Sequence, residues 1–281
     1  MQLISKSKTL DLTTPQVMGI VNITPDSFSD GGKYHQLDHA LHHVEAMIEA
    51  GTAIIDIGGE STRPGAADVN VETELARVIP VIEAIRQRFD CWISIDTSKA
   101  QVMTEAVNVG ADLINDVRAL QDLGALDAAA QANVPICLMH MQGQPRTMQS
   151  DPNYDDLIVD VNQFFIERIQ ACEQNGIARQ QLILDPGFGF GKTMAHNYQL
   201  LAQLEQFHQF GLPLLAGMSR KSMISKLLNK PPIDCVAGSL ACATIAAMKG
   251  AQIIRVHDVQ ETIDVIKICN IVMNHSKLMQ I

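Results

Sequence analysis

Short runs of valine, isoleucine and leucine recur along the chain, separated by longer stretches in which apolar and polar residues mix. Within each short run the residues are apolar at nearly every position, which is typical of a strand covered on both faces. We therefore predict strands at residues 16–22, 53–58, 92–97, 113–117, 135–140, 182–186, 213–218 and 252–257.

The longer stretches between these runs have the apolar spacing of amphipathic helices. Several of them end in glycine or asparagine just before the next strand, which is the expected stop signal. We predict helices at residues 37–51, 71–89, 99–110, 123–133, 156–176, 196–211 and 220–229, an apolar helix at 239–248, and a last helix from about residue 260.

This alternation of strand and helix predicts an α/β protein with a single domain over residues 1–281, a (β/α)8 TIM barrel. No linker, low-complexity tract or convincing internal repeat interrupts it. A doubly wound open sheet is the alternative architecture that the pattern leaves open.

Composition narrows the range of partners. The net charge of -10 and the pI near 5.3 argue against a general nucleic-acid or anionic-membrane surface, because both need clustered positive charge. The apolar stretch 235–248 is shorter than the roughly 20 residues needed to cross a bilayer, so we expect a buried helix there. The six cysteines lack metal-ligand spacing and the N-terminus lacks the apolar core of a signal peptide, which favours a cytoplasmic protein with reduced thiols.

The segment QLILDPGFGFGKT at residues 181–193 ends like a nucleotide-binding loop. A Walker-type loop needs glycine where this chain has Pro186, and a dinucleotide fingerprint needs a third glycine where it has Lys192. The loop therefore belongs to neither class.

Polar residues that are costly to bury stand at the predicted strand ends, where barrel enzymes place their chemistry. They are Asn22, Asp56, Asp96, Asn115, His140, Asp185, Lys221, Arg255 and His257. The two carboxylates Asp96 and Asp185, with the amide of Asn115, suit a flat heterocycle that presents N–H groups. The alternative for these three residues is that they cap the following helices or hold loops.

Candidate cations for an anion site are Arg63, Lys221, Arg255 and His257, with Arg220 less clear. Arg255 and His257 stand two apart on the last strand, so both point to the same face. A guanidinium and an imidazole at that height suit an anion. The alternative for His257 is a core histidine satisfied by Asp258. The remaining histidines, including His39, His42 and His43, are interpreted as a solvated helix face and not as a metal site.

Two predicted loops, residues 22–34 and 58–69, are long and rich in glycine, serine, proline and charge. Such βα loops act as flexible lids that exclude water from reactive intermediates. Ordinary surface connections are the alternative.

Several segments taken together closely resemble the bacterial dihydropteroate synthase family. They are MGIVNITPDSFSDGG, AIIDIGGESTRPGA, ISIDTSK, INDVRAL, LMHMQGQPRTM, ILDPGFGFGKT, GMSRKSMI and RVHDV, and the resemblance runs from about residue 16 to 262. The family joins (7,8-dihydropterin-6-yl)methyl diphosphate to 4-aminobenzoate, releasing pyrophosphate and giving 7,8-dihydropteroate for folate biosynthesis. The resemblance implies a pterin-binding barrel that works as a homodimer with Mg2+.

The resemblance also implies roles for individual residues. The pterin would be held by Asp96, Asn115, Asp185, Lys221 and Arg255. The diphosphate would be held by Asn22, Arg63, Arg255 and His257, with Mg2+ at Asn22. The aminobenzoate pocket would be lined by Thr62, Pro64, Phe190, Lys221 and Ser222. The catalytic set would be Asp96, Lys221, Arg63, Arg255 and His257.

A neutral arylamine needs no strong base, which agrees with the absence of a nucleophile–base motif. We therefore expect a dissociative substitution in which Mg2+ and the basic residues draw off pyrophosphate and Asp96 stabilises the pterin cation. Two alternatives stay open: a pterin-dependent methyltransferase of similar barrel type with a corrinoid partner, and a non-catalytic pterin-binding relative.

Overall fold

The computed structural model describes residues 1–6, 8–24, 33–61, 68–144 and 147–275. Every predicted strand is present within a residue or two of its expected bounds, except that the seventh is shorter. The strands are β3 (Gln16–Asn22), β4 (Ile54–Gly58), β5 (Trp92–Asp96), β6 (Leu113–Asp116), β7 (Ile136–Met139), β8 (Leu182–Asp185), β9 (Leu215–Ala216) and β10 (Ile253–Val256).

These strands form an eight-stranded sheet in the order β8-β7-β6-β5-β4-β3-β10-β9, with each neighbouring pair parallel. A bridge between Leu184 and Leu214 joins the two ends of the sheet. The predicted TIM barrel is therefore confirmed, and the open-sheet alternative is wrong.

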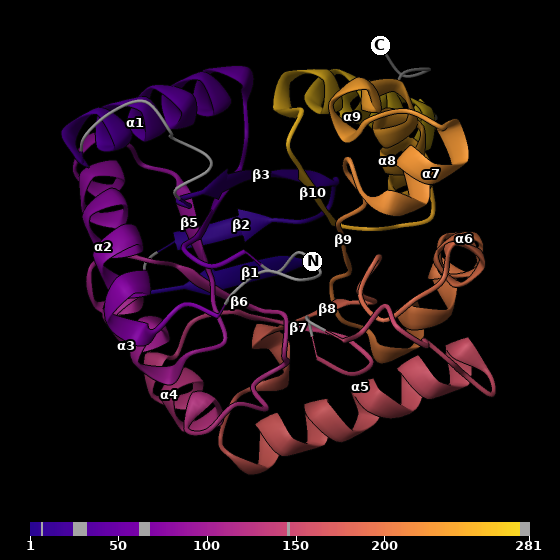
Figure 1. The fold of residues 1–281 in the computed structure, drawn as a ribbon, viewed down its shortest axis with the longest axis horizontal. Helices are drawn as coiled ribbons and strands as arrows, with labels where there is room; N and C mark the ends of the chain where they lie inside the picture. Colours follow the sequence, from indigo (N-terminus) through magenta and orange to yellow (C-terminus); the bar gives the residue numbers. More distant parts are fainter. Residues whose placement is uncertain (7, 25–32, 62–67, 145–146, 276–281) are drawn as a thin grey trace.

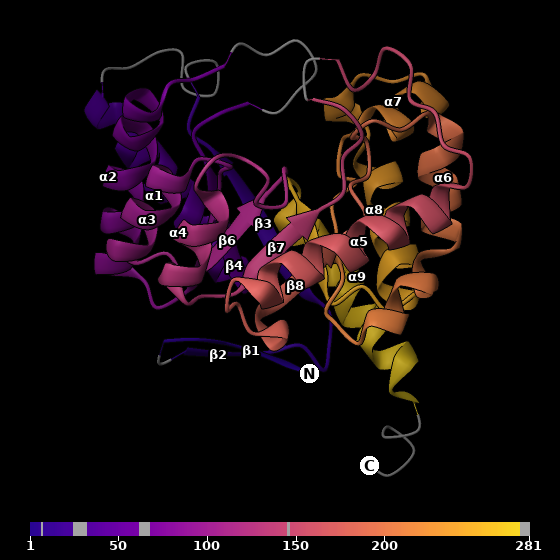
Figure 2. The same ribbon diagram turned by 90° about the horizontal axis from the view of Figure 1, so that it is seen from below.

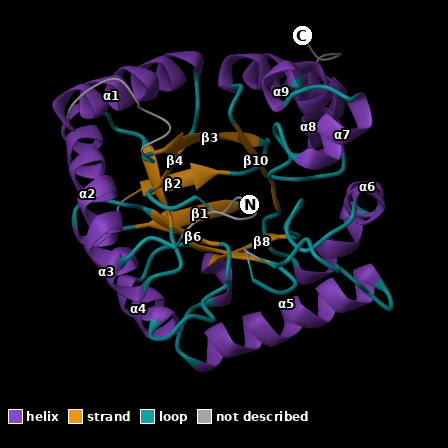
Figure 3. Ribbon diagram, in the orientation of Figure 1, coloured by secondary structure: helices purple, strands orange, loops and turns teal. Residues whose placement is uncertain are grey.

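Helices surround the strands on all sides, as Figures 1 and 3 show. They are α1 (Lys33–Ala50), α2 (Val71–Arg88), α3 (Ala100–Asn108), α4 (Ala125–Ala132), α5 (Leu157–Gln174), α6 (Met194–Ala202), α7 (Ser222–Leu228), α8 (Val236–Met248) and α9 (Val259–Met273). The single helix predicted at 196–211 is instead α6 followed by the 3-10 helix η3 (Leu204–Phe210). In η3 the core-facing residues Leu204, Phe207 and Phe210 are spaced by three, the period of a 3-10 helix.

The helix ends follow the local signals in the sequence. The side chains of Asn70, Asp156 and Thr193 accept hydrogen bonds from the first-turn amides of α2, α5 and α6. Helices α4 and α7 end at Asn133 and Asn229, both in the left-handed conformation. The predicted asparagine stops are confirmed.

The inward-facing side chains are layered along the barrel axis, and two of these layers differ sharply in polarity. The lower layer is an apolar cluster made by one residue from each strand: Met18, Ile54, Trp92, Leu113, Cys137, Ile183, Leu215 and Ile253. Because side chains two apart share a face, the next layer up contains Asp56, Ser94, Asn115, Asp185 and Arg255. Two residues along each strand thus separate an apolar layer from a polar one. The ionisable groups therefore lie toward the carboxyl end of the barrel.

An N-terminal hairpin, which the sequence analysis missed, lies across the other end of the barrel (Figure 2). Its antiparallel strands are β1 (Gln2–Ser5) and β2 (Lys8–Asp11). Leu3, Leu10 and Leu12 pack into the lower apolar layer. Each strand spans only four residues with few apolar positions, so the pattern carried no strand signal.

Helix α8 corrects the expectation of a buried helix at 235–248. One face of α8 is buried, but Ala237, Ala241, Ile245 and Met248 are exposed. Since every side chain in this stretch is small or apolar, its sequence had no polar face to reveal the exposed side. None of the described helices has the length and apolar character needed to span a membrane.

Candidate active site

Arg255, on β10, occupies the centre of the upper layer. Its Nε donates to Asp56 on β4 at 2.6 Å and its Nη2 donates to Asp96 on β5 at 2.7 Å. One guanidinium thus joins two carboxylates across the barrel mouth.

Asp56 is a central residue of the site to which the sequence analysis gave no role. Its side chain is fully buried and also accepts from Nδ2 of Asn115 at 3.3 Å. Its position at a strand end was visible in the sequence, but its partner Arg255 lies 199 residues away along the chain. Asp56 therefore orients both the arginine and the amide.

Asp185 and Lys221 form the other side of the mouth. Lys221 Nζ donates to the carbonyl oxygen of Phe188 at 2.7 Å, and it lies 4.6 Å from the centroid of the Phe190 ring. Asp185 accepts from the amide of Gly187 at 2.7 Å, so this carboxylate also holds the start of its own loop. The loop-holding alternative is therefore correct for one oxygen of Asp185.

Burial dominates the acid–base properties of the site. It raises the pKa of Asp96 to about 7, against the opposing charge of Arg255 and with the help of Asp56. It also raises the pKa of Asp185, against Lys221. For Lys221, burial lowers the pKa to about 8, although Asp185 acts in the other direction. Burial also opposes the charge of Arg255, but Asp56 and Asp96 outweigh it and its pKa rises.

His257 follows Arg255 by two residues, directly after β10. Burial, followed by the charges of Arg255 and Arg220, lowers its pKa to about 4. Its Nδ1 lies 3.2 Å from Oγ of Ser219, and its predicted alternative partner Asp258 instead pairs with Arg220. The alternative of a histidine satisfied by Asp258 is therefore wrong.

Arg220, the less clear of the candidate cations, is paired with Asp258 within the protein. Its backbone is left-handed, with φ 58, which is costly for a side chain other than glycine. Ion pairing with Asp258 and a hydrogen bond from its amide to Ser239 Oγ at 3.0 Å hold it there. This fixes the backbone directly before Lys221.

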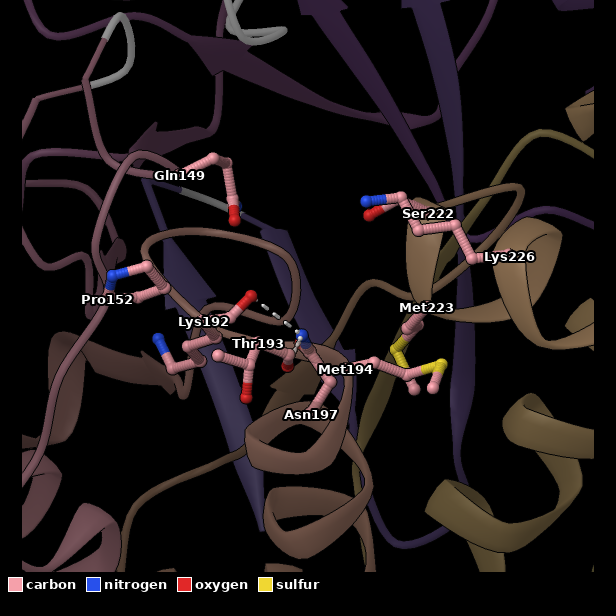
Figure 4. A pocket seen from close by; sticks show the side chains of 9 residues that line it. All are labelled: Gln149, Pro152, Lys192, Thr193, Met194, Asn197, Ser222, Met223 and Lys226. Carbon is pink, nitrogen blue, oxygen red and sulfur yellow. Dashed lines mark hydrogen bonds between the residues drawn. The ribbon is translucent and has the colours of Figure 1, made fainter.

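An apolar cluster borders the polar mouth on the side of β7. Phe190 packs there with Val117, Met139 and Met148. Of these four residues, the sequence analysis singled out only Phe190. Beyond Lys221, a cavity of about 280 Å³ opens between the start of α6 and α7. Ser222 and Lys226 line it from α7, Asn197 lines it from α6, and Thr193 lines it from the position just before α6 (Figure 4).

The remaining predicted site residues are placed as follows. Asn22 ends β3 and its Oδ1 faces Gly58 at the same end of the barrel. Thr62, Arg63 and Pro64, and most of the two predicted lid loops, lie outside the described residues. His39, His42 and His43 are exposed on α1, as expected of a solvated face. In the described ranges no group of three or more His, Cys, Asp or Glu side chains is arranged to hold a metal ion.

Comparison with known proteins identifies the family. Residues 18–257 match the family described as pterin binding enzyme. The dihydropteroate synthase of Escherichia coli (strain K12) is 61% identical over 268 residues, which is 95% of each chain. The chain belongs to the dihydropteroate synthase family.

Solved structures of family members superpose closely on this fold. The Yersinia pestis dihydropteroate synthase, solved with a sulfonamide drug complex, has a TM-score of 0.94 and 61% identity, covering 97% of this chain and 99% of its own. The Xanthomonas albilineans dihydropteroate synthase, solved with 4-aminobenzoic acid, has a TM-score of 0.92 and 48% identity, covering 97% and 98%. The enzyme is thus a transferase that forms a carbon–nitrogen bond, and the methyltransferase and non-catalytic alternatives are set aside.

Proposed function

We propose that the dihydropterin ring binds in the barrel mouth between Asp96, Asn115, Asp185, Lys221 and Arg255. The observation that carries this assignment is the Arg255 guanidinium, which joins Asp56 and Asp96 at 2.6 and 2.7 Å. Buried carboxylates at this depth need donors, and the N–H edge of a pterin supplies them. Their raised pKa values mark groups that gain from such a ligand.

The substitution we propose is dissociative. The bond between the pterin methylene carbon and the diphosphate oxygen breaks first, and pyrophosphate leaves with the electron pair. The amine nitrogen of 4-aminobenzoate then forms the new C–N bond and loses one proton to solvent. Asp96, ionised beside the cation, stabilises that intermediate, while Arg63, Arg255 and His257 bind the leaving group.

Magnesium fits this site as a partner of the diphosphate. The Asn22 amide oxygen is a hard, neutral ligand, and its side chain makes no hydrogen bond within the described residues. Mg2+ in enzymes commonly takes few protein ligands and completes its shell with phosphate oxygens and water. When bound at Asn22 it would neutralise charge on the leaving pyrophosphate.

The aminobenzoate pocket proposed here joins Phe190, Lys221 and Ser222 with Thr62 and Pro64. Phe190 and Lys221 are already in contact, with the ammonium 4.6 Å from the ring centroid. The Xanthomonas albilineans relative solved with 4-aminobenzoic acid supports a site for this substrate. The Yersinia pestis relative solved with a sulfonamide drug supports a second expectation, that sulfonamides raise the KM for 4-aminobenzoate but not for the pterin.

Positional isotope exchange tests the dissociative step. The dihydropterin diphosphate for this test carries 18O in the oxygen that joins the methylene carbon to phosphorus. It is incubated with enzyme and Mg2+ but without aminobenzoate. Repeated dissociation and return scrambles the label into the non-bridging positions. A fully active enzyme that never scrambles the label would contradict the proposed cation, and an enzyme that releases no pyrophosphate with both substrates present would contradict the residue assignments.

A homodimer is proposed from the apolar surface of α7, α8 and α9. Large apolar side chains are exposed there, among them Leu227, Ile245 and Ile268, at 57%, 43% and 66%. Surfaces of this kind are normally covered. Sedimentation should give a dimer for the native chain and a monomer for Ile245→Asp. Ile166→Asp, on the exposed surface of α5, is the matched control and should remain a dimer. A monomeric native chain at micromolar concentration would refute this proposal.

A cytoplasmic location is proposed from the thiols. All six cysteines are buried and unpaired. Free thiols persist in a reducing compartment. Cell fractionation that recovers the enzyme outside the cytoplasm would contradict this.

A further inference from the structure

The loop after β8, residues 186–192, packs against the chain that follows β7. A Cβ at Gly187 would lie 1.8 Å from the carbonyl oxygen of His140, and one at Gly191 would lie 2.4 Å from that of Gln142. Both glycines also have left-handed φ values, 74 and 60. Only glycine allows the two backbones to come this close.

A buried lysine at the end of the loop connects these two segments. Lys192 is 3% exposed and its Nζ lies 2.8 Å from Nδ1 of His140. The same Nζ donates to the carbonyl oxygens of Phe190 at 3.0 Å and of His140 at 3.3 Å. Three neutral acceptors thus satisfy its three donors, in a place where no carboxylate of the described residues forms an ion pair with it.

Burying the Lys192 ammonium without an ion-pair partner among the described residues lowers the stability of the fold. Burial lowers the pKa of Lys192 to about 7, with Asp185 acting in the other direction. An apolar side chain of the same length would avoid the cost of desolvating an ammonium. The position of the lysine therefore calls for an explanation other than stability.

Two lysines hold the loop backbone at Phe190 and just before it. Lys221 holds the carbonyl of Phe188, two residues before it, and Lys192 holds the carbonyl of Phe190 itself. The Phe190 ring packs on Met139 and Met148 and faces the Lys221 ammonium. Releasing the Phe190 carbonyl would free the backbone that sets the direction of this ring.

We propose that Lys192 and His140 form a clamp that positions Phe190 for the second substrate, which makes Lys192 a positioning residue for 4-aminobenzoate. This inference rests on the assignment of Phe190 to the aminobenzoate pocket made above. The clamp acts through the loop backbone at Phe190, so it affects the arylamine site. The pterin contacts assigned to Asp96, Asn115 and Arg255 come from other strands and stay nearly unchanged.

Lys192→Met tests the clamp because methionine is an unbranched side chain of similar volume that lacks the ammonium. The expected result is a KM for 4-aminobenzoate raised about tenfold, the usual scale for one charged hydrogen bond. The KM for dihydropterin diphosphate and the calorimetric pterin Kd should stay within about twofold of the native values. An equal rise in both KM values, or an unchanged KM for aminobenzoate in a folded variant, would overturn the proposal.

Two substitutions at His140 provide a test that survives if Lys192→Met fails to fold. Asparagine and leucine have nearly the same shape, and both remove the ring contact with Phe164, whose centroid lies 4.9 Å away. Only His140→Asn restores an acceptor for Lys192. The clamp requires His140→Asn to have the lower KM for aminobenzoate, and equal values for the two variants would refute it.

Two further variants separate the clamp from the assumption beneath it. Phe190→Ala should raise the KM for aminobenzoate; if it does not, the assignment of Phe190 fails. If it does and Lys192→Met does not, only the clamp fails. Lys249→Met, which breaks a surface ion pair with Glu205 at 2.8 Å, controls for the loss of one lysine charge.

Discussion

The lower and upper inward layers of the barrel are built from the same strands but are stabilised in different ways. In the lower layer Ile54, Leu113 and Ile253 gain free energy from burial alone and need no specific partner. In the upper layer Asp56 and Arg255 are stable only together, because each would be an uncompensated buried charge without the other. A change in the lower layer should therefore cost only the volume removed, whereas a change in the upper layer should also affect the partners left behind.

The largest effect is expected from Arg255→Met. Removing the guanidinium leaves the fully buried Asp56 and the nearly buried Asp96 without a positive partner. The free energy of unfolding should fall by about 3–5 kcal/mol, the usual result of breaking a buried pair from one side, and activity should be lost. Urea unfolding and a product assay measure the two results.

The double variant Arg255→Met/Asp56→Asn sharpens this test. Neutralising the orphaned carboxylate should recover about half of the lost stability but none of the activity. A double variant no more stable than Arg255→Met would show that the arginine stabilises the barrel through packing and not through charge.

Leu113→Ala should have the next largest effect, on stability alone. Leu113 is fully buried in the lower layer, and its truncation should cost about 3 kcal/mol. At a temperature where the variant is folded, kcat should equal the native value. A reduced kcat there would show that the two layers are coupled and would break the comparison.

Asp185→Asn should weaken pterin binding while the fold stays intact. One charged acceptor is lost, so the pterin Kd should rise about thirtyfold in calorimetry. Asp116→Asn is the matched control: Asp116 is also fully buried, but it holds Ser98 and the amides of Arg118 and Leu120. The control should lose stability and keep its pterin affinity; unchanged binding by Asp185→Asn would remove that residue from the site.

Taken per pH unit, the smallest effect is expected in the pH dependence of stability. Asp96 has a pKa of about 7 in the folded protein, against the ordinary value of 3.8 for an aspartate side chain in water. Between these values the folded state keeps a proton that the unfolded state has lost, so stability falls as pH rises, by about 1.4 kcal/mol per pH unit for one proton. Asp96→Asn should remove this contribution to the slope of unfolding free energy between pH 4 and 7; an identical slope in both proteins would show that Asp96 does not titrate there.

Much of the fold was predictable because its signals are local. Buried parallel strands are continuous apolar runs, and asparagine at 133 and 229 stops helices by its own conformational preference. The hairpin at Gln2–Ser5 and Lys8–Asp11 escaped because its burial depends on the barrel floor, which strands far along the chain supply.

In the candidate site, too, local signals identified some features, and contacts between distant residues determined the others. Strand-end position identified Asp96, Asn115, Asp185 and Arg255 as polar residues near one another. The partners of Asp56 and Lys192 are fixed only by the closed barrel, which brings Arg255 to Asp56 and His140 to Lys192. The sequence therefore could not reveal the roles of Asp56 and Lys192.

The N-terminal hairpin packs against a barrel floor that is built by strands far along the chain. Leu3 and Ile253 belong to one cluster, so their contact closes a very large loop of polypeptide. Contacts between such distant residues tend to form late in folding. Partly folded molecules therefore expose the leucines of the hairpin and the apolar floor, a surface that favours aggregation.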